Sequence, residues 1–132
     1  MATVDVSNGI NAGTHPSRAI RKEPYKVEFD LNLATATTTK GSALASADVL
    51  QVIDIPAKTM VWAAGLEVVT PNDGDFQIDI GTGADPDAFA DNFDCDGTST
   101  GDMTSIPAAY APLIVSADDT VDVVVGPTAG SA

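Results

Sequence analysis

Hydrophobic and polar residues alternate along several short stretches of this 132-residue chain, and a two-residue period is typical of half-buried strands. The clearest case covers residues 25–33, where every second residue is apolar: Tyr25, Val27, Phe29, Leu31 and Leu33. Apolar residues also dominate residues 49–55, 59–70, 76–80, 109–115 and 120–125, and we expect a strand in each. In the longest of these segments, Met60, Trp62, Ala64, Leu66 and Val68 share one face, and we expect Trp62 to belong to the core.

Turn-forming residues lie between these segments. Pro71-Asn72-Asp73-Gly74 separates residues 59–70 from residues 76–80, and this arrangement predicts a β-hairpin. Residues 34–46 are rich in Thr, Ala and Ser and are predicted to form a loop, with a helical turn left open at residues 43–48. Residues 81–102 hold four glycines and six aspartates, so we expect a long surface loop there, with a helical turn left open at residues 87–92.

Short strands joined by turns throughout the chain predict an all-β fold, either a β-sandwich or a jelly-roll. The length suits one hydrophobic core, which we assign to residues 24–132 as a single β-sandwich domain. Residues 1–23 lack a sustained hydrophobic period and contain Asn8-Gly9, Gly13 and His15-Pro16. They are therefore predicted to be an extended N-terminal arm.

Charge is distributed unevenly between two parts of the chain. Residues 1–58 hold six acids and all six basic residues, so the formal charge of −13 belongs to residues 59–132. An acidic surface of this kind repels phosphate, and we expect no binding to nucleic acid. The single cysteine excludes an intramolecular disulfide, and no apolar stretch reaches the roughly 18 residues of a membrane span. We therefore expect a soluble protein that is made in the cytoplasm and has no membrane partner.

The sequence offers little for catalysis. His15, the only histidine, lies in the predicted arm, where no folded wall would orient it against a serine or a carboxylate. Cys95 lies between Asp94 and Asp96, whose negative charge raises a thiol pKa and disfavours the reactive thiolate. We therefore expect no enzymatic activity, and the alternative of a hydrolase with dispersed carboxylates rests on the abundance of acids alone.

The aspartate-rich loop is the one segment that suggests a metal site. Asn92, Asp94, Asp96 and Gly97 match positions 1, 3, 5 and 6 of a calcium-binding loop, but Met103 stands where that loop requires a bidentate glutamate. A calcium site built differently would draw on Asp85, Asp87, Asp91, Asp94 and Asp96. With such a site the chain would be a calcium-dependent carbohydrate-binding module, and without it no cofactor is expected.

Two stretches of the chain carry distinctive motifs. The first is Ile-Pro-Ala-Lys-Thr at residues 55–59, followed by the apolar residues 60–68, and the second is residues 80–89, which contain Asp85-Pro86-Asp87. Both stretches resemble small structural proteins of tailed-bacteriophage virions. In this group of proteins an Ile-Pro-Ala-x-Thr strand entry leads into an apolar strand, and an Asp-Pro-Asp loop precedes the later strands. Over residues 49–125 the chain is therefore similar to a capsid decoration protein, also called a cement protein.

The resemblance implies a β-sandwich that binds the outer face of an icosahedral shell, commonly as a homotrimer at three-fold positions. Its partner would be the major capsid protein, and no catalytic residues carry over. The predicted arm is the one basic and irregular part of the chain, so we expect it to reach across capsid subunits through His15, Arg18, Arg21 and Lys22. The chain would then be a virion structural protein that bridges neighbouring subunits on the capsid surface. A head-fibre or tail adaptor component of the virion is the alternative, because the same β-fold would serve there.

Overall fold

The computed structural model describes residues 1–6, 24–72, 74–96, 101–104 and 112–129. Within these ranges the strands are β1 (Thr3–Asp5), β2 (Val49–Ile55), β3 (Met60–Val61), β4 (Phe76–Gly81), β5 (Ala90–Asp94), β6 (Leu113–Ile114) and β7 (Asp119–Ala129), and one helix, α1, covers Leu33–Lys40. The strands form a five-stranded mixed sheet and a separate two-stranded sheet. The predicted predominance of β-structure is therefore confirmed.

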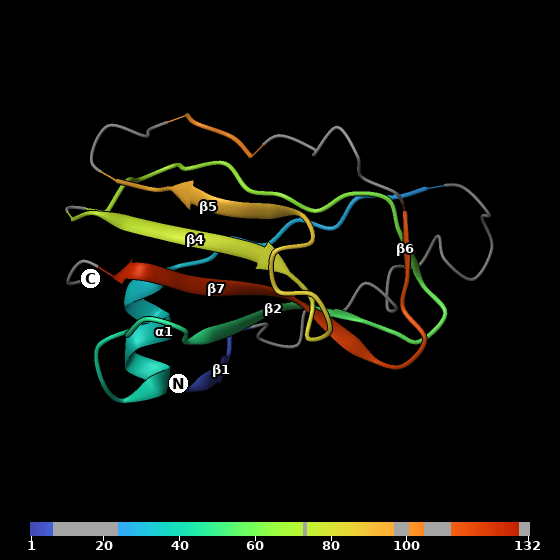
Figure 1. Cartoon of the computed structure of the whole chain (residues 1–132), viewed down its shortest axis with the longest axis horizontal. Helices are drawn as coiled ribbons and strands as arrows, with labels where there is room; N and C mark the ends of the chain where they lie inside the picture. The colour runs from blue at the N-terminus through green and yellow to red at the C-terminus, as the bar shows by residue number, and fades with distance from the viewer. Residues whose placement is uncertain (7–23, 73, 97–100, 105–111, 130–132) are drawn as a thin grey trace.

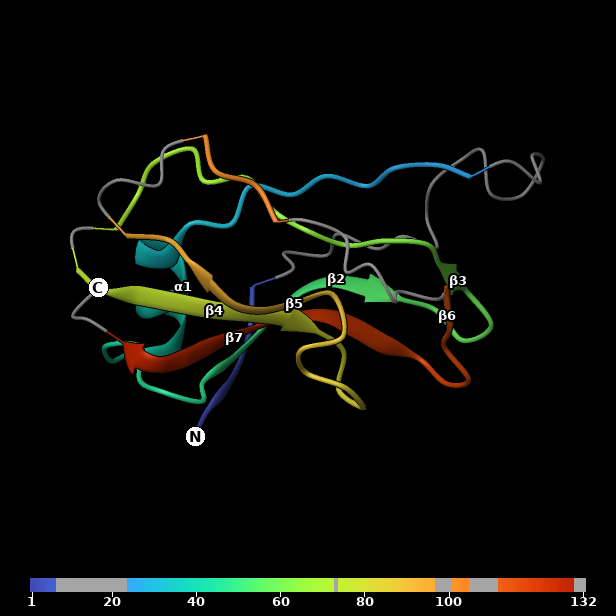
Figure 2. The same ribbon diagram turned by 45° about the horizontal axis from the view of Figure 1, so that its top comes forward.

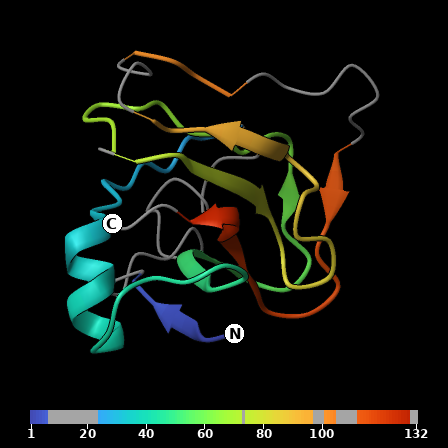
Figure 3. The same ribbon diagram turned by 60° about the vertical axis from the view of Figure 1, so that its left-hand side comes forward.

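The five strands lie in the order β1-β2-β7-β4-β5, with β1 parallel to β2 and every other neighbouring pair antiparallel (Figure 1). α1 packs beside β1 at one end of the molecule (Figure 3), whereas the β3–β6 pair lies at the opposite end (Figures 1 and 2). Because β7 lies between β2 and β4, the last strand of the chain holds the sheet together at its centre.

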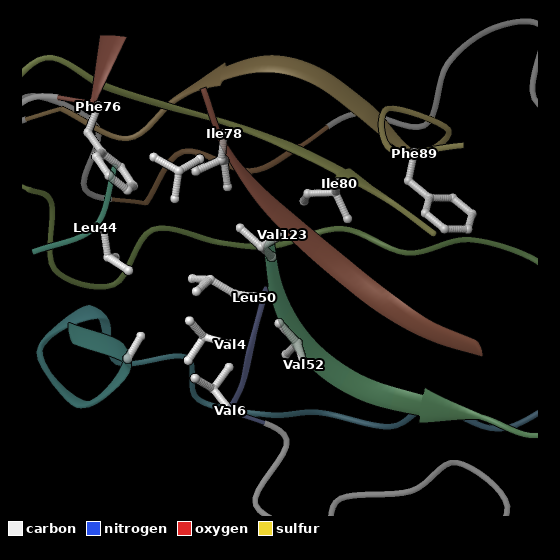
Figure 4. Close-up of a cluster of buried hydrophobic side chains, with 12 residues drawn as sticks. Val4, Val6, Leu44, Leu50, Val52, Phe76, Ile78, Ile80, Phe89 and Val123 are labelled. Carbon is white, nitrogen blue, oxygen red and sulfur yellow. The ribbon is translucent and has the colours of Figure 1, made fainter. Parts of the chain in front are cut away.

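One face of the five-stranded sheet carries the core. Leu50, Val123 and Ile80 lie opposite one another on β2, β7 and β4, and all three are buried. Figure 4 shows them in one cluster with side chains from β1, from the rest of β2 and β4 and from the connections: Val4, Val6, Leu44, Val52, Phe76, Ile78 and Phe89. The core therefore joins residues from the beginning, the middle and the end of the chain.

The first residues of the chain belong to this sheet. β1 pairs with β2 from Thr3 to Asp5, and both Val4 and Val6 are buried, so the prediction of an arm over residues 1–23 is wrong at its start. A strand of three residues is at the short limit for strands, and its alternation is too brief to stand out in the sequence. Residues 7–23, the remainder of the predicted arm, lie outside the described residues.

Two extended segments, residues 24–32 and 62–72, run lengthwise along the core side of the five-stranded sheet (Figure 2). Tyr25, Val27, Phe29 and Leu31 are half-buried and alternate with exposed residues, as their pattern predicts. The strands predicted over residues 25–33 and 59–70 are nevertheless largely wrong, because the regular pairing of these segments with other described residues is limited to β3 and to one bridge between Glu67 and Met103. We call residues 24–32, 60–72, 101–104 and 113–114 the outer layer.

α1 forms in a segment that was predicted to be a loop. Asn32 begins it, because the Oδ1 atom of Asn32 accepts the N–H groups of Ala34 at 2.9 Å and Thr35 at 3.2 Å. Gly41 ends it in the left-handed region, with a φ of 81°, and donates its N–H to the carbonyl groups of Thr37 and Thr38. The two caps therefore outweigh the low helix propensity of the threonines between them.

The predicted hairpin across residues 71–74 does not form. β4 pairs with β5 and β7, so the chain crosses from the outer layer to the five-stranded sheet instead of turning back within one sheet. The connection is held by Cys95, whose carbonyl accepts the N–H of Asn72 at 3.0 Å and whose N–H donates to Phe76 at 2.8 Å. The backbone groups of Asn72 and Phe76 thus both form hydrogen bonds with Cys95, the residue that follows β5, and not with each other.

The long loop predicted over residues 81–102 is also wrong, since it contains β5 and a fully buried side chain, Phe89. The turn before β5 folds tightly over the end of β4, where a Cβ atom on Gly81 would lie 2.1 Å from the carbonyl oxygen of Asp85. Only glycine fits at that close approach. No helix forms at residues 43–48 or at residues 87–92, where a helical turn had been left open.

Three strands agree well with the sequence pattern. β2 coincides with the strand predicted over residues 49–55, β4 contains the one predicted over residues 76–80, and β7 contains the one predicted over residues 120–125. β6 covers only Leu113–Ile114 of the strand predicted over residues 109–115, and residues 109–111 of that segment lie outside the described residues. The patterns that succeed belong to strands in the interior of the sheet, where neighbours on both sides hold the backbone extended.

Candidate interaction surface

Large apolar side chains are exposed mainly on the outer layer. In the described ranges six large hydrophobic residues are exposed, of which one is Met1 and five belong to the outer layer. The five are Met60, Trp62, Val69, Met103 and Ile114, with exposed fractions of 51%, 60%, 76%, 67% and 61%. We refer to these five residues as the outer apolar surface.

At one end of this surface, strand pairing turns three side chains outward. Met60 lies opposite Ile114, so these two side chains share one face of the β3–β6 pair. Val61 and Leu113, the next pair, point the other way and pack against the core. Trp62 follows Met60 by two residues and is exposed beside it. Burial of Val61 and Leu113 therefore places Met60, Trp62 and Ile114 on the solvent side.

A second pairing turns Val69 and Met103 outward at the other end. The N–H of Val68 donates to the carbonyl of Asp102 at 2.9 Å, and Gly101 donates to the carbonyl of Val68 at 2.8 Å. Val68 is buried, so its neighbour Val69 faces solvent. Met103 lies opposite the exposed Glu67. Residues 60–69 thus present large apolar side chains to solvent at each end, with Gly65 and Glu67 exposed between the two ends.

The sequence pattern placed Met60 and Trp62 on one face with Ala64, Leu66 and Val68 and assigned Trp62 to the core, and this prediction is wrong. Ala64, Leu66 and Val68 do turn toward the core, but Val61 takes the inward position where Met60 and Trp62 were expected. The alternation slips by one residue at Trp62 and Ala63, which are both exposed. Two alanines and a glycine at residues 63–65 contribute little apolar area, so nothing in this stretch fixes the phase of the pattern.

Charged groups border the β3 end of the outer apolar surface. Lys58 is exposed, lies two residues before Met60, and donates its backbone N–H to Val115 at 2.6 Å. Among the lysines that the structure describes, Lys26 pairs with Glu28 and Lys40 pairs with Asp48, whereas Lys58 forms no ion pair within the described ranges. Asp118 lies beside it, because its carboxylate accepts the N–H of Ala57 at 2.8 Å. A cation and a carboxylate therefore stand at one edge of the surface.

The predicted capsid-binding residues of the arm are His15, Arg18, Arg21 and Lys22. All four lie outside the described residues. Their role as a capsid-binding arm stays a prediction.

The five aspartates of the predicted calcium site spread over the connection before β5, β5 itself and the second residue after it: Asp85, Asp87, Asp91, Asp94 and Asp96. The pKa of Asp85 is raised because Asp87 can accept a hydrogen bond from its protonated form, with desolvation and repulsion by the Asp87 carboxylate acting in the same direction. Asp91 instead accepts the side-chain amide of Asn92 at 2.6 Å. In no part of the chain that the structure describes do three His, Cys, Asp or Glu side chains gather as a metal ion would require. The described aspartates therefore do not assemble one calcium site.

Cys95 is half-buried at the end of β5. Burial, followed by the negative charge of Asp94, raises the pKa of its thiol to about 11. The raised pKa predicted from the neighbouring aspartates is confirmed, although burial is the larger cause. The reactive thiolate is accordingly scarce at neutral pH.

Within the described ranges no helix has the length and apolar character that a bilayer crossing needs, since α1 has eight residues. Comparisons of the chain with protein-family models, with curated proteins and with solved structures find no match. Its function is therefore inferred from its own residues.

Proposed function

We propose that this chain is a virion structural protein, which decorates the outer surface of a phage capsid and stabilises it by bridging neighbouring capsid subunits. The observation that carries the proposal is the outer apolar surface. Soluble monomers rarely group large exposed apolar side chains on one part of the molecule, and such groups usually mark contact with another protein. The class of partner comes from the resemblance of residues 55–68 and 80–89 to capsid decoration proteins.

We further propose that the fold is a β-sandwich in which the outer layer is the second sheet. Val61, Leu66 and Leu113 of that layer pack against the core of the five-stranded sheet, as the inner faces of a sandwich do. Two-residue strands and a single bridge are all the regular pairing described in this layer.

A decoration protein works by binding and not by catalysis. Each copy that contacts two capsid subunits adds buried area to the assembled shell. Because a copy can contact both subunits only in the assembled shell, its binding stabilises the shell against disassembly. The buried Asp48 serves the fold, because it links the N-terminus, α1 and the start of β2 through three hydrogen bonds.

The proposal divides two tasks between two parts of the chain. The basic residues before Pro24 would contact the capsid, whose outer face must then carry complementary acidic groups. The outer apolar surface would contact further protein in the decorated layer, where a homotrimer at three-fold positions is the arrangement that the resemblance implies. β1 precedes the arm and is part of the sheet, so a test of the arm has to leave residues 1–6 in place.

Co-sedimentation with capsid shells tests the proposal. Purified chain is mixed with shells assembled from the major capsid protein of the same phage, and we expect it to pellet with them until the sites are saturated. Substituting Arg18→Ala, Arg21→Ala and Lys22→Ala together should weaken this binding by about tenfold or more, because each removes a charge that faces the capsid. Lys26→Ala is the control, since Lys26 is an exposed lysine of the folded part.

The possible outcomes test the decoration function and the role of the arm separately. Wild-type chain that stays in the supernatant with intact shells contradicts the decoration function. Wild-type chain that pellets equally well with and without the three arm substitutions contradicts the role of the arm but leaves the decoration function standing.

A further inference from the structure

One buried carboxylate lies on the face of the five-stranded sheet that turns away from the core. Val123 of β7 points into the core, so Asp122, the residue before it, points to the opposite face. Asp122 is nevertheless only 4% exposed. It lies opposite Gln51 on β2 and Gly81 on β4, in the middle strand of the sheet. Something on that face therefore keeps water from the carboxyl group.

The connection between β4 and β5 covers this part of the sheet. A Cβ atom on Gly81 would lie 2.1 Å from the carbonyl oxygen of Asp85 and 2.3 Å from the carbonyl carbon of Pro86. Because Gly81 and Asp122 lie opposite each other, the backbone of Asp85 and Pro86 crosses the face to which Asp122 points. Figure 2 shows the connection on the side of the sheet that faces away from the outer layer. We call residues 82–88 the β4–β5 turn.

Asp122 has little to balance a negative charge. The hydroxyl of Thr120 donates a hydrogen bond to its carboxylate, and within the described ranges no lysine forms an ion pair with it. The other titratable side chains of the surrounding strands and of the turn are all acids: Asp119 on β7, Asp54 on β2, Asp79 on β4, Asp5 on β1, and Asp85 and Asp87 in the turn. An ionised carboxylate that is buried among like charges is unfavourable unless water reaches it.

We propose that the β4–β5 turn is a proton-sensitive clasp, which stays closed over Asp122 when this residue is protonated and opens more readily when it is ionised. Opening lets water reach the carboxylate. Burial raises the pKa of Asp122, the hydrogen bond from Thr120 opposes this rise, and the charge of Asp119 adds to it. The closed turn thus binds the proton more tightly than the open turn, and a fall in pH favours closure. The clasp belongs to the chain alone and does not depend on the proposed function.

Opening of the clasp should be local. Phe89 follows the turn and is fully buried, so it holds the chain to the core while residues 82–88 move. In the closed turn the N–H groups of Thr82 and Ala88 both donate to the carbonyl of Asp85, at 2.8 Å and 3.3 Å. These two amides become free to exchange with solvent when the turn opens.

Hydrogen exchange of these two amides, followed by NMR and corrected for the pH dependence of free amides, measures the opening. Between about pH 8 and pH 4.5, protection of Thr82 and Ala88 should increase, by up to tenfold for each unit by which closure raises the pKa of Asp122. Asp122→Asn is neutral throughout this range, so its turn should be well protected at every pH. Asp54→Asn is the matched control, because it removes a carboxylate from the same face and should keep the pH dependence.

The amide of Val125 distinguishes opening of the turn from unfolding of the sheet, since it donates to the carbonyl of Asp48 at 2.9 Å. Equal protection of the turn at both ends of the pH range overturns the inference. So does a pH dependence that persists in Asp122→Asn, or one that Val125 follows by the same factor.

Thr120→Val gives a test that does not need the asparagine variant to fold. Valine has the shape of threonine but cannot donate the hydrogen bond that favours the ionised form of Asp122. The midpoint of the change in protection should therefore move to higher pH. A midpoint that stays in place or moves to lower pH contradicts the assignment of the clasp to Asp122.

Discussion

Replacing Asp48 by alanine should lower the free energy of unfolding by about 3–5 kcal/mol, the loss expected when one partner of a buried ion pair is removed. The side chain of Asp48 is 1% exposed and that of its partner Lys40 is 13% exposed. The carboxylate also accepts the backbone N–H groups of Ala2 and Ala45, each at 2.8 Å. The substitution therefore leaves a largely buried ammonium without its counter-ion and two N–H groups without an acceptor.

The same carboxylate makes stability depend on pH. Burial disfavours its ionisation, but the hydrogen bonds from Lys40, Ala45 and Ala2 and the charge of Lys40 outweigh burial and lower the pKa of Asp48 to about 2. A folded pKa below the ordinary value of 3.8 gives stability that is present above about pH 4 and is lost as the pH falls toward 2. The stability difference between the wild type and Asp48→Asn should therefore shrink over that window.

Another aspartate acts with the opposite sign. Burial, opposed by a hydrogen bond from Thr120 and assisted by the charge of Asp119, raises the pKa of Asp122, so its contribution to stability grows as the pH falls. Asp122 is present in both the wild type and Asp48→Asn, and its effect cancels in their difference. Measuring the difference, and not the wild type alone, isolates Asp48.

Urea unfolding followed by far-ultraviolet circular dichroism measures these effects. Asp30→Ala is the matched control because it removes an exposed carboxylate, and it should change stability by less than about 0.5 kcal/mol. Lys40→Ala and the double variant complete a thermodynamic cycle, in which the double variant should lose less than the sum of the two single losses. An Asp48→Ala protein as stable as Asp30→Ala would show that the ion pair does not hold β1 and α1 in place.

Replacing Phe89 by alanine should cost about 3–5 kcal/mol, because it removes a fully buried aromatic side chain and leaves a cavity. Phe89 lies beside Ile80 in the core, and its N–H donates to the carbonyl of Ile80 at 2.8 Å (Figure 4). The side chain therefore fastens the connection before β5 to the end of β4. Its loss should also loosen the tight turn in which Asp85 approaches Gly81.

Phe93→Ala is the matched comparison for Phe89→Ala. Phe93 lies opposite Ile78 on the edge strand β5 and is only half-buried, so its truncation should cost about 1–2 kcal/mol. Both losses are measured by urea unfolding. The slope of the unfolding free energy against urea concentration should not change, since neither variant alters how much surface unfolding exposes. A loss for Phe89→Ala no larger than that for Phe93→Ala would contradict the assignment of Phe89 to the core.

The sequence predicts the strands that are long and enclosed, and it fails where local patterns compete with contacts made elsewhere. β2 and β7 are rich in β-branched residues and lie inside the sheet, so their apolar runs are unambiguous. α1 was missed because its threonines favour other conformations, whereas its stability comes from the caps Asn32 and Gly41. The spacing of these two caps is the sequence signal that would have revealed the helix.

The candidate surface could be predicted only in part. The richness of residues 59–70 in apolar side chains is visible in the sequence, but whether Trp62 points inward depends on a one-residue slip that the pairing of Val61 with Leu113 decides. Met103 and Ile114 join the surface through pairings with residues far away in the chain, which no local pattern reveals. The aspartates of the loop were visible in the sequence as well, yet β5 separates them.

Electron microscopy of capsid shells reconstituted with this chain tests the decoration function most directly. We predict ordered density on the outer face of the shell, at positions where capsid subunits meet, with neighbouring copies in contact through the end of the molecule that holds β3 and β6. The same shells with the Trp62→Glu chain should show lower occupancy, because copies that no longer contact one another lose the gain from joint binding. Shells that carry no added density at saturating chain, while the chain remains folded, would contradict the decoration function.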